Sequence, residues 1–562
     1  MKGYELFPGV GVGFACSMPA LEAIHRRAAS ELAASTLPSP GGNKAGDSMG
    51  EAQTAGPPML IEGGPYRGCW LESTGSISAE ILSRFLPGLA ADTFTLFARH
   101  MRADGLMPYK ILPSGAAYRQ IQMVTPLARS VWNHYSLNGG NKAFLAEMYG
   151  AMARFDEWLA AHRDTRKTGC VEAFCTFDTG HDLSPRFWHV PDTCFGEDAA
   201  RFDPESPLLP FLAPDLTANV ACQRRYLALM ARELGDEARA RDWESAAAAS
   251  TESLMRHCFD PADGFFYDRD RSGNFVRIQS DVLLRVLACE IGDDGLFESS
   301  LCRYLLNTRK FFSRYPLTSI ALDDPRFDPA SDYNSWGGAV NFLSLVRAPA
   351  AFELHGRHVE LTWIMQPILS AALRFTRFPQ CLSPWTGDEG FTEGYTPTML
   401  CLLDYIERLC GIMPRPEGRL WFTGLLPSCL SGVQASGTGI VGGIQGASSA
   451  GISGGSSADG AFTTYAREID GSTFTLCNSD SGCEILCDGN ALARFPRGIR
   501  LVTDRSGALT GITGMSLQPV SGNLAFMGVE YPFTIRGNEE QVFVEGRFAT
   551  MRDPGIVAIC HG

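Results

Sequence analysis

The chain has 562 residues, of which 45% are hydrophobic and 20% are charged, and its formal net charge is −14. This length exceeds what a single compact core holds, so we expect two domains in a globular protein. The acidic balance, without any run of Lys or Arg, argues against nucleic acid or an anionic membrane as the main partner.

The seventeen cysteines are scattered, and none has the spacing of a structural zinc site. Scattered cysteines are typical of small buried side chains in a reducing compartment. Glu5 and Pro8 interrupt the first apolar run, which makes it a poor secretory signal. No run of about 18 apolar residues could form a spanning helix. We therefore predict a cytoplasmic protein with no metal, no cofactor, and neither a membrane nor a nucleic acid as partner.

Residues 1–60 are expected to form an N-terminal segment with a helix at 20–34. A stretch at 39–58, rich in Gly, Ser and Pro, predicts a mobile surface loop.

From residue 61 to residue 423 the chain shows apolar residues at helical spacing, interrupted by short turns with Gly and Asp. The expected helices are 79–101 (split at Pro87), 121–135, 143–162, 215–234, 237–258, 281–289, 296–306, 340–347, 361–377 and 398–409. Because many of them pair as hairpins, we predict a mainly α catalytic domain that closes into a toroid of helical hairpins.

The last part of the chain changes character twice. Residues 424–460 are Gly/Ser-rich and predict a linker or a disordered insertion. Residues 461–562 predict a small C-terminal antiparallel β domain in a supporting role. Its expected strands are 461–469, 473–478, 499–503, 524–529 and 541–548.

Four loops between helical elements combine aromatic residues with Gly and polar groups. They cover residues 66–72, 176–188, 333–338 and 385–395. In a toroid such loops converge on one face, where they can line a single pocket. Aromatic faces stack on sugar rings and paired carboxyl groups cleave glycosidic bonds, so the loops point to a glycosidase.

An inverting glycosidase needs one carboxyl group as proton donor and a second that activates water. Asp182 lies just before Phe187 and Trp188, an aromatic setting that raises the pKa of a carboxyl group and suits the donor. Glu393 lies between two aromatic residues of the fourth loop and suits the base. Asp182 could instead cap a helix, and Glu393 could complement the dipole of the helix expected at 398.

Further residues of these loops are candidates for binding substrate. The set is Trp70, Glu72, Gln122, Asp178, Arg186, Trp188, Trp336, Trp385 and Tyr395. The tryptophans can stack on sugar rings or pack in the core. Arg186 can orient Asp182, bind a sugar or carboxylate, or form an ion pair. Gln122 can bond hydroxyl groups or be an exposed polar residue.

Residues 180–187, GHDLSPRF, resemble the Gly-x-Asp-Asn-Ser-Pro-Arg signature of glycoside hydrolase family 63 and the trehalase group. Residues 214–219, 263–268, 333–338 and 392–397 resemble further motifs of that group in the same order. The resemblance implies an (α/α)6 toroid, Asp182 as general acid, Glu393 as general base, and inversion. The chain departs from the group's pattern at Leu183, where Asn is usual, and at Glu72, where Asp is usual, so the sugar is not implied.

We therefore expect a metal-independent inverting glycoside hydrolase that acts on an α-linked glucoside or a similar small glycoside. One alternative is another enzyme on the same toroid, such as an α-L-rhamnosidase or a lyase, although no Tyr or His stands out as the base that a lyase needs. The other is a non-catalytic sugar-binding protein, against which the two acids count.

Overall fold

The computed structural model describes residues 11–40, 56–330, 332–430 and 460–561, in two compact units. The larger unit comprises residues 27–404, 414–418 and 554–562, and the smaller comprises 1–26, 405–413 and 419–553. Most of the loop expected at 39–58 and of the tract at 424–460 lies outside the described residues.

The larger unit is built mainly from helices. They are α2 (Ile77–Leu82), α3 (Pro87–Arg99), α4 (Leu127–Leu137), α5 (Lys142–His162), α6 (Pro214–Glu233), α7 (Glu237–His257), α8 (Val282–Leu287), α9 (Asp294–Ser300), α10 (Phe342–Leu345), α11 (Ala348–Leu354) and α12 (His358–Ala372). Two more helices, α1 (Pro19–Ala34) and α13 (Thr396–Cys410), have residues in both units. Each helix of the described ranges is too short or too polar to span a bilayer.

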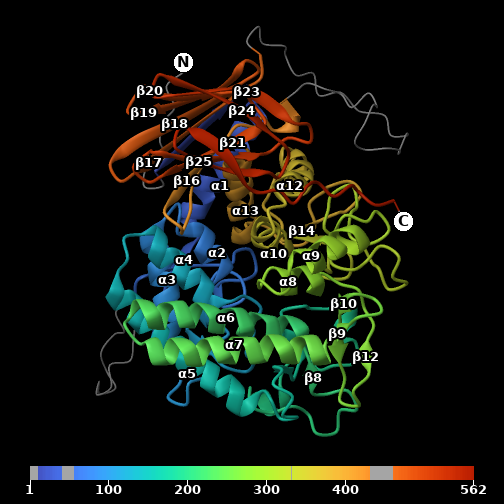
Figure 1. Ribbon diagram of the computed structural model, residues 1–562. Helices are drawn as coiled ribbons and strands as arrows, with labels where there is room; N and C mark the ends of the chain where they lie inside the picture. The colour runs from blue at the N-terminus through green and yellow to red at the C-terminus, as the bar shows by residue number, and fades with distance from the viewer. Residues whose placement is uncertain (1–10, 41–55, 331, 431–459, 562) are drawn as a thin grey trace. The chain divides into compact units, whose positions relative to one another are not determined.

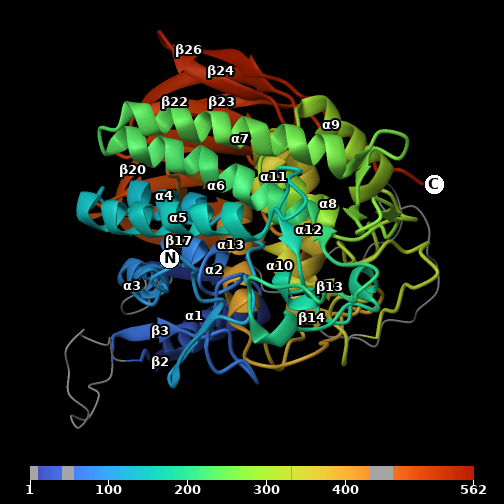
Figure 2. The same ribbon diagram turned by 90° about the horizontal axis from the view of Figure 1, so that it is seen from below.

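The expected hairpins are present where turn residues can cap the second helix. Asn141 accepts hydrogen bonds from the amides of Ala143 and Phe144 at the start of α5, and Asp236 accepts one from Arg239 at the start of α7. Side-chain oxygens at these positions satisfy amides that the helix itself cannot. Helices α6 and α7 consequently run side by side as a long hairpin (Figures 1 and 2).

Prolines set several helix starts. The helix expected at 79–101 is divided into α2 and α3, and α3 begins at Pro87, where the missing N–H costs nothing. The helix expected from residue 121 begins only at Leu127, after Pro126. The preceding residues form a loop in which Gln122 has a φ of 40°.

Short strands fix the loops between helices. Strand β4 (Cys69–Trp70) pairs with β5 (Lys110–Leu112), which pairs with β6 (Gly115–Ala117). Strands β7 (Glu172–Ala173), β8 (Phe211–Leu212), β11 (Asp268–Arg269) and β12 (Phe275–Val276) form a four-stranded sheet. Strand β13 (Val340–Asn341) pairs with β14 (Cys381–Leu382), so the chain after the third loop runs beside the chain before the fourth. Two further pairs join β2 (Thr36–Pro38) to β3 (Pro58–Leu60) and β9 (Phe259–Asp260) to β10 (Phe265–Phe266).

The smaller unit contains two antiparallel sheets, which bear out the expected β region (Figure 1). The first has the order β1-β17-β18-β19-β20-β23-β24 and the second β15-β16-β21-β22-β25-β26. Their strands are β1 (Val12–Cys16), β15 (Ile412–Pro414), β16 (Arg419–Thr423), β17 (Phe462–Ile469), β18 (Ser472–Ser479), β19 (Gly482–Cys487), β20 (Asn490–Phe495), β21 (Ile499–Asp504), β22 (Leu509–Gly514), β23 (Val520–Phe526), β24 (Val529–Ile535), β25 (Glu540–Val544) and β26 (Arg547–Arg552).

Two features of this unit differ from the sequence prediction. The strand expected at 541–548 is a hairpin, β25 and β26, whose turn residues Glu545 and Gly546 both have positive φ. The N-terminal segment expected at 1–60 is divided between the two units at residue 26. Its first strand, β1, belongs to the smaller unit because it pairs with β17.

Candidate active site

Asp182 lies in a tight turn at the centre of the second loop. The amide of Ser184 donates to the carbonyl of His181 at 3.1 Å, which closes a β-turn with Asp182 and Leu183 in its middle. Burial, followed by the negative charges of Glu72 and Asp192, raises the pKa of Asp182 to about 7. A carboxyl group in this state holds a proton near neutral pH, as a general acid must.

Glu72 packs directly against the loop that carries Asp182. It is buried, and its Oε2 would lie 1.7 Å from a Cβ atom added to Gly180, so only glycine fits there. Gly180 also has a φ of 67°, which favours glycine. Burial and then Glu62 raise the pKa of Glu72 to about 8, although Arg285 and Arg347 act in the opposite direction.

Glu62 is a third buried acid beside these two, and the sequence did not single it out. The Tyr395 hydroxyl donates to its Oε1 at 2.6 Å. Burial is the main cause that raises the pKa of Glu62 to about 7, and the negative charge of Asp182 adds to it. Glu62 precedes Gly63, Gly64 and Pro65, a sequence that predicts only a turn. Its partner is 333 residues away in the sequence, so no local pattern could have found it.

Glu393 lies on the fourth loop, with an exposed side chain. Its loop is joined to the segment of Glu62 through the backbone, since the amide of Thr396 donates to the carbonyl of Glu62 at 2.9 Å. A Cβ atom added to Gly64 would lie 2.5 Å from the carbonyl oxygen of Glu393. The fourth loop therefore contacts the segment that directly precedes the first loop.

Tyr66 links the loops that carry the acids. Its ring lies 5.5 Å from that of Trp70 and 6.3 Å from that of Tyr395, both edge to face. Burial first, and then the charges of Glu62, Asp182 and Glu72, raise the pKa of Tyr66 above its usual range. One partly exposed tyrosine is thus close to all three acids.

The four candidate tryptophans have different surroundings. Trp336 is buried, and its ring contacts that of His181 at 4.6 Å and the Arg285 guanidinium at 4.8 Å. It supports the loop from inside and does not offer a face to a sugar. Trp70 is partly exposed, whereas Trp188 and Trp385 are 49% and 45% exposed and could contact a ligand.

Gln122 and Glu72 offer buried oxygen atoms in this region. The Oε1 of Gln122 and the Oε2 of Glu72 have no hydrogen-bond partner among the described residues. Gln122 also bonds to Glu72, which lowers the pKa of Glu72 slightly against the effect of burial. Buried polar atoms normally have partners, so hydroxyl groups of a ligand suit these two positions.

Arg186 and Asp178 have other roles than the expected contact with substrate. Arg186 is fully buried and forms bidentate pairs with Asp215 and Asp268 at 2.7–3.0 Å. The carboxylate of Asp178 pairs with Arg163 at 2.5 Å and accepts from two backbone amides. Neither the Arg186 guanidinium nor the Asp178 carboxylate is available to a substrate, because other protein groups already occupy its hydrogen-bonding positions.

Three buried side chains, those of His181, Asp281 and Arg285, support the turn that carries Asp182. His181 accepts from Arg186 at its Nδ1, and its Nε2 lies 2.9 Å from Asp281. Burial, together with Arg285, lowers the pKa of His181 to about 3, so the ring is neutral. Arg285 donates to the carbonyl of Thr179 at 2.8 Å. The backbone on both sides of Gly180 is therefore fixed by buried side chains.

The sequence also matches a known family. The model of the mannosylglycerate hydrolase MGH1-like glycoside hydrolase domain matches residues 69–395. The chain belongs to this family of glycoside hydrolases. The MGH1-like domain spans the loops of Glu72, Asp182 and Glu393, and the match confirms the resemblance to glycoside hydrolase family 63 and the trehalase group.

Solved structures resemble the chain in fold. A family 63 mannosylglycerate hydrolase from Thermus thermophilus, in complex with Tris, is 17% identical, with a TM-score of 0.55 over 68% of this chain and 99% of the other. A family 78 rhamnosidase of Bacillus sp. GL1 is 10% identical, with a TM-score of 0.53 over 85% of this chain and 41% of the other. A sialidase is 14% identical, with a TM-score of 0.59 over 87% and 41%. By sequence, no curated protein matches the chain at a significant level.

The MGH1-like domain also contains a group of possible metal ligands and a surface pocket, and neither fits a role in hydrolysis. The thiols of Cys175 and Cys194 and a carboxylate oxygen of Asp178 lie within 4.8 Å of one another, a grouping that could hold a metal ion. Arg163 pairs with that carboxylate and donates to the Cys194 sulfur at 3.6 Å. A cation would therefore face a guanidinium at contact distance, which opposes binding.

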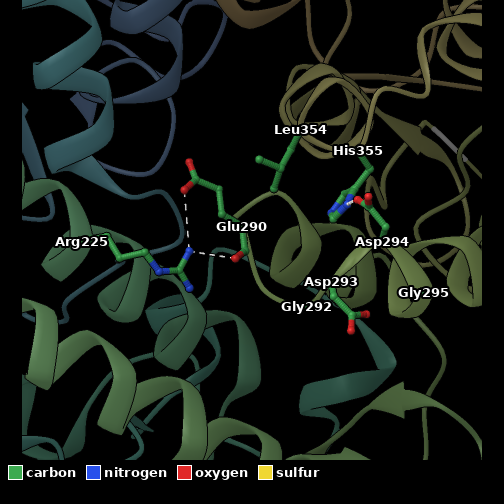
Figure 3. Close-up of a pocket in the computed structure, with 8 residues that line it drawn as sticks. All are labelled: Arg225, Glu290, Gly292, Asp293, Asp294, Gly295, Leu354 and His355. Atoms are coloured by element: carbon green, nitrogen blue, oxygen red, sulfur yellow. Dashed lines mark hydrogen bonds and ion pairs between the residues drawn. The ribbon is translucent and has the colours of Figure 1, made fainter. Parts of the chain in front are cut away.

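A surface pocket of about 620 Å³ contains none of the candidate residues. Figure 3 shows the residues that line it. It is lined by Arg225, Glu290, Gly292, Asp293, Asp294, Gly295, Leu354 and His355. Arg225 lies 3.6 Å from Glu290 and His355 lies 2.7 Å from Asp294. Because Arg225 pairs with Glu290 and His355 contacts Asp294, we assign the pocket no role in the reaction.

Proposed function

We propose that this glycoside hydrolase cleaves small α-linked glycosides with inversion, with Asp182 as general acid and Glu393 as general base. The observation that carries the proposal is the surroundings of Asp182. It lies in a rigid turn beside Glu72, and burial raises its pKa to about 7. Glu393 has an exposed side chain on a loop joined to the segment of Glu62, where water can reach it.

In this reaction the Asp182 carboxyl donates its proton to the glycosidic oxygen as the bond to the anomeric carbon breaks. Glu393 removes a proton from a water molecule that attacks the same carbon from the opposite face. The products are the free alcohol and a sugar of inverted anomeric configuration. In the next cycle Asp182 regains a proton and Glu393 releases one.

We further propose that Glu72 and Gln122 bind hydroxyl groups of the sugar, and that Trp70 and Tyr66 flank it. The unpartnered buried oxygens of Glu72 and Gln122 support this role. A family description that names mannosylglycerate, itself a small glycoside, supports a small substrate. It makes α-mannosides as well as α-glucosides the first compounds to test.

The helical hairpins support a closed (α/α)6 toroid as the scaffold, since the structure shares its fold with a family 63 enzyme. A cytoplasmic location is supported by the cysteines, all seventeen of which lie in the described ranges and are free thiols. An α-L-rhamnosidase remains a second candidate, because the similarity in fold to the family 78 enzyme extends over 85% of the chain. Membership of a hydrolase family argues against a purely sugar-binding role.

The test is hydrolysis of a panel of α- and β-glycosides of mannose, glucose and rhamnose, with the released anomer followed by proton NMR. We expect turnover of an α-mannoside or α-glucoside and a β-sugar as the first product. Release of the α-anomer first from an α-glycoside would rule out inversion, and turnover of the rhamnoside alone would favour the second candidate.

A further inference from the structure

Leu183, directly after the proposed general acid, has a backbone conformation that leucine seldom adopts. It occupies the third position of the turn closed by His181 and Ser184, with a φ of 61°. Glycine and asparagine adopt this left-handed region readily, whereas the backbone of a residue with a larger side chain is disfavoured there. The turn itself therefore does not favour leucine at this position.

The side chain of Leu183 gains little from folding. It is 58% exposed, which makes it one of the most exposed large apolar residues of the larger unit. Trp188 and Phe195, farther along the same segment, are also exposed. The leucine is therefore strained and poorly buried at the same time, a combination that packing within the protein does not explain.

The position of Leu183 relative to the reaction is set by its neighbour. The carboxyl of a general acid must reach the glycosidic oxygen, the atom that leaves with the aglycone. The Cα atoms of consecutive residues are about 3.8 Å apart. The backbone of Leu183 therefore lies close to the proposed proton donor, and its exposed side chain is within reach of an aglycone that extends out of the site.

We propose that Leu183 is a specificity-determining residue that binds an apolar aglycone, an alkyl or aryl group, on the leaving-group side of Asp182. This inference rests on the proposed function, because it takes Asp182 as the proton donor. A bound aglycone covers the exposed side chain, and the burial offsets the unfavourable backbone conformation. A small polar aglycone gains nothing from this contact.

The probe is a series of methyl, n-butyl and n-hexyl glycosides of whichever sugar and anomer the wild type hydrolyses. Their leaving alcohols have similar acidity, so differences in kcat/KM report contact and not chemistry. Complete burial of a methylene is equivalent to about a fourfold gain, and contact on one side to about twofold. We expect kcat/KM of the wild type to rise by about twofold per methylene at first.

The informative variant is Leu183→Asn, which suits the turn but lacks the apolar surface. We expect a kcat/KM that no longer depends on chain length, activity on the methyl glycoside within about twofold of wild type, and a Tm that is unchanged or higher. Leu183→Met should keep the dependence. The matched control is Leu229→Gln, which replaces an exposed leucine on α6 outside the loop of Asp182. This variant should keep the wild-type dependence of kcat/KM on chain length.

Three results would overturn the inference. The first is a wild type whose kcat/KM is the same for all three glycosides, and the second is a Leu183→Asn variant that keeps the full dependence on chain length. The third is a marked fall in Tm for Leu183→Asn, which would mean that the leucine stabilises the fold. If the wild type hydrolyses no glycoside at all, the proposed function fails instead.

Discussion

The loop of Asp182 and the loop of Glu393 are held in place by different interactions. Around Asp182, buried side chains provide the support, since Arg186 pairs with Asp215 and Asp268 and Arg163 pairs with Asp178. The loop of Glu393 is held by the partly exposed pair of Arg377 with Glu389 and by backbone hydrogen bonds. Among these bonds, the amide of Tyr395 donates to the carbonyl of Phe378 and the amide of Gln380 to the carbonyl of Phe391, both at 2.8 Å.

This difference matches the two tasks of an inverting pair. A proton donor needs a desolvated carboxyl in a fixed position, and a buried framework of charges provides rigidity without exposing the acid to water. A base that activates water must remain accessible to it. The comparison teaches that the surroundings of the two acids, and not their residue type, distinguish the roles that we propose for them.

The largest expected effect is that of Asp182→Asn. The amide cannot donate a proton in the reaction, so kcat on an alkyl glycoside should fall by about 10³- to 10⁴-fold with an unchanged Tm. A glycoside with a good leaving group, such as 4-nitrophenol, needs little protonation and should lose much less. Equal losses on both substrates would contradict the assignment of Asp182 as the acid.

Glu393→Gln should lower kcat by about 10²- to 10³-fold, because water then attacks without the help of a base. Here the loss should be the same for the alkyl and the 4-nitrophenyl glycoside, since protonation of the leaving group is intact. Comparison of kcat for both variants on both substrates separates acid from base. Wild-type turnover by this variant would exclude Glu393 from the reaction.

Arg186→Met tests the buried framework. Loss of this guanidinium leaves Asp215 and Asp268 buried without their partner, so the free energy of unfolding should drop by about 3–5 kcal/mol. The control in the other loop is Arg377→Met, whose pair with Glu389 is partly exposed, at 42% for Arg377 and 16% for Glu389, and should contribute only about 1 kcal/mol. Urea unfolding followed by tryptophan fluorescence measures the free energy of unfolding of both variants. Similar losses in the two variants would contradict the proposed difference between the loops.

The smallest effect concerns pH. Asp182 donates only when protonated, so kcat/KM should fall as the pH rises through about 7. Asp182 and Glu72 lose their protons as a coupled pair, and the charge left by the first loss opposes the second. Glu72→Gln removes that repulsion and moves this alkaline limb to lower pH, by roughly half a unit. The exposed Glu252→Gln on α7 is the control and should leave the limb in place. A shift to higher pH would show that Glu72 does not act through its charge.

The same variant has a consequence for stability with a defined sign. Folding raises the pKa of Glu72 to about 8, so its ionisation costs the folded state free energy that increases from about pH 4 to pH 8. Glu72→Gln avoids that cost, and its Tm should exceed that of wild type at pH 9 but not at pH 5.

The sequence alone determined the features that depend on local pattern. The helical hairpins followed from apolar spacing and from capping residues such as Asn141 and Asp236, and the division at Pro87 followed from a missing N–H. The family followed from a short motif around Asp182. These inferences hold because helix formation, capping and motif chemistry involve residues close together in the chain.

Only the tertiary structure decided which polar residues line the site and which support it. Glu62 joined the acids through a partner 333 residues away, while Arg186 and Asp178, which look like ligand-binding residues in sequence, are used up by buried pairs. Strand β1 pairs with β17, although most of the chain separates them in the sequence. The physical reason is that burial and charge pairing depend on distances in space, which a sequence pattern a few residues long does not contain.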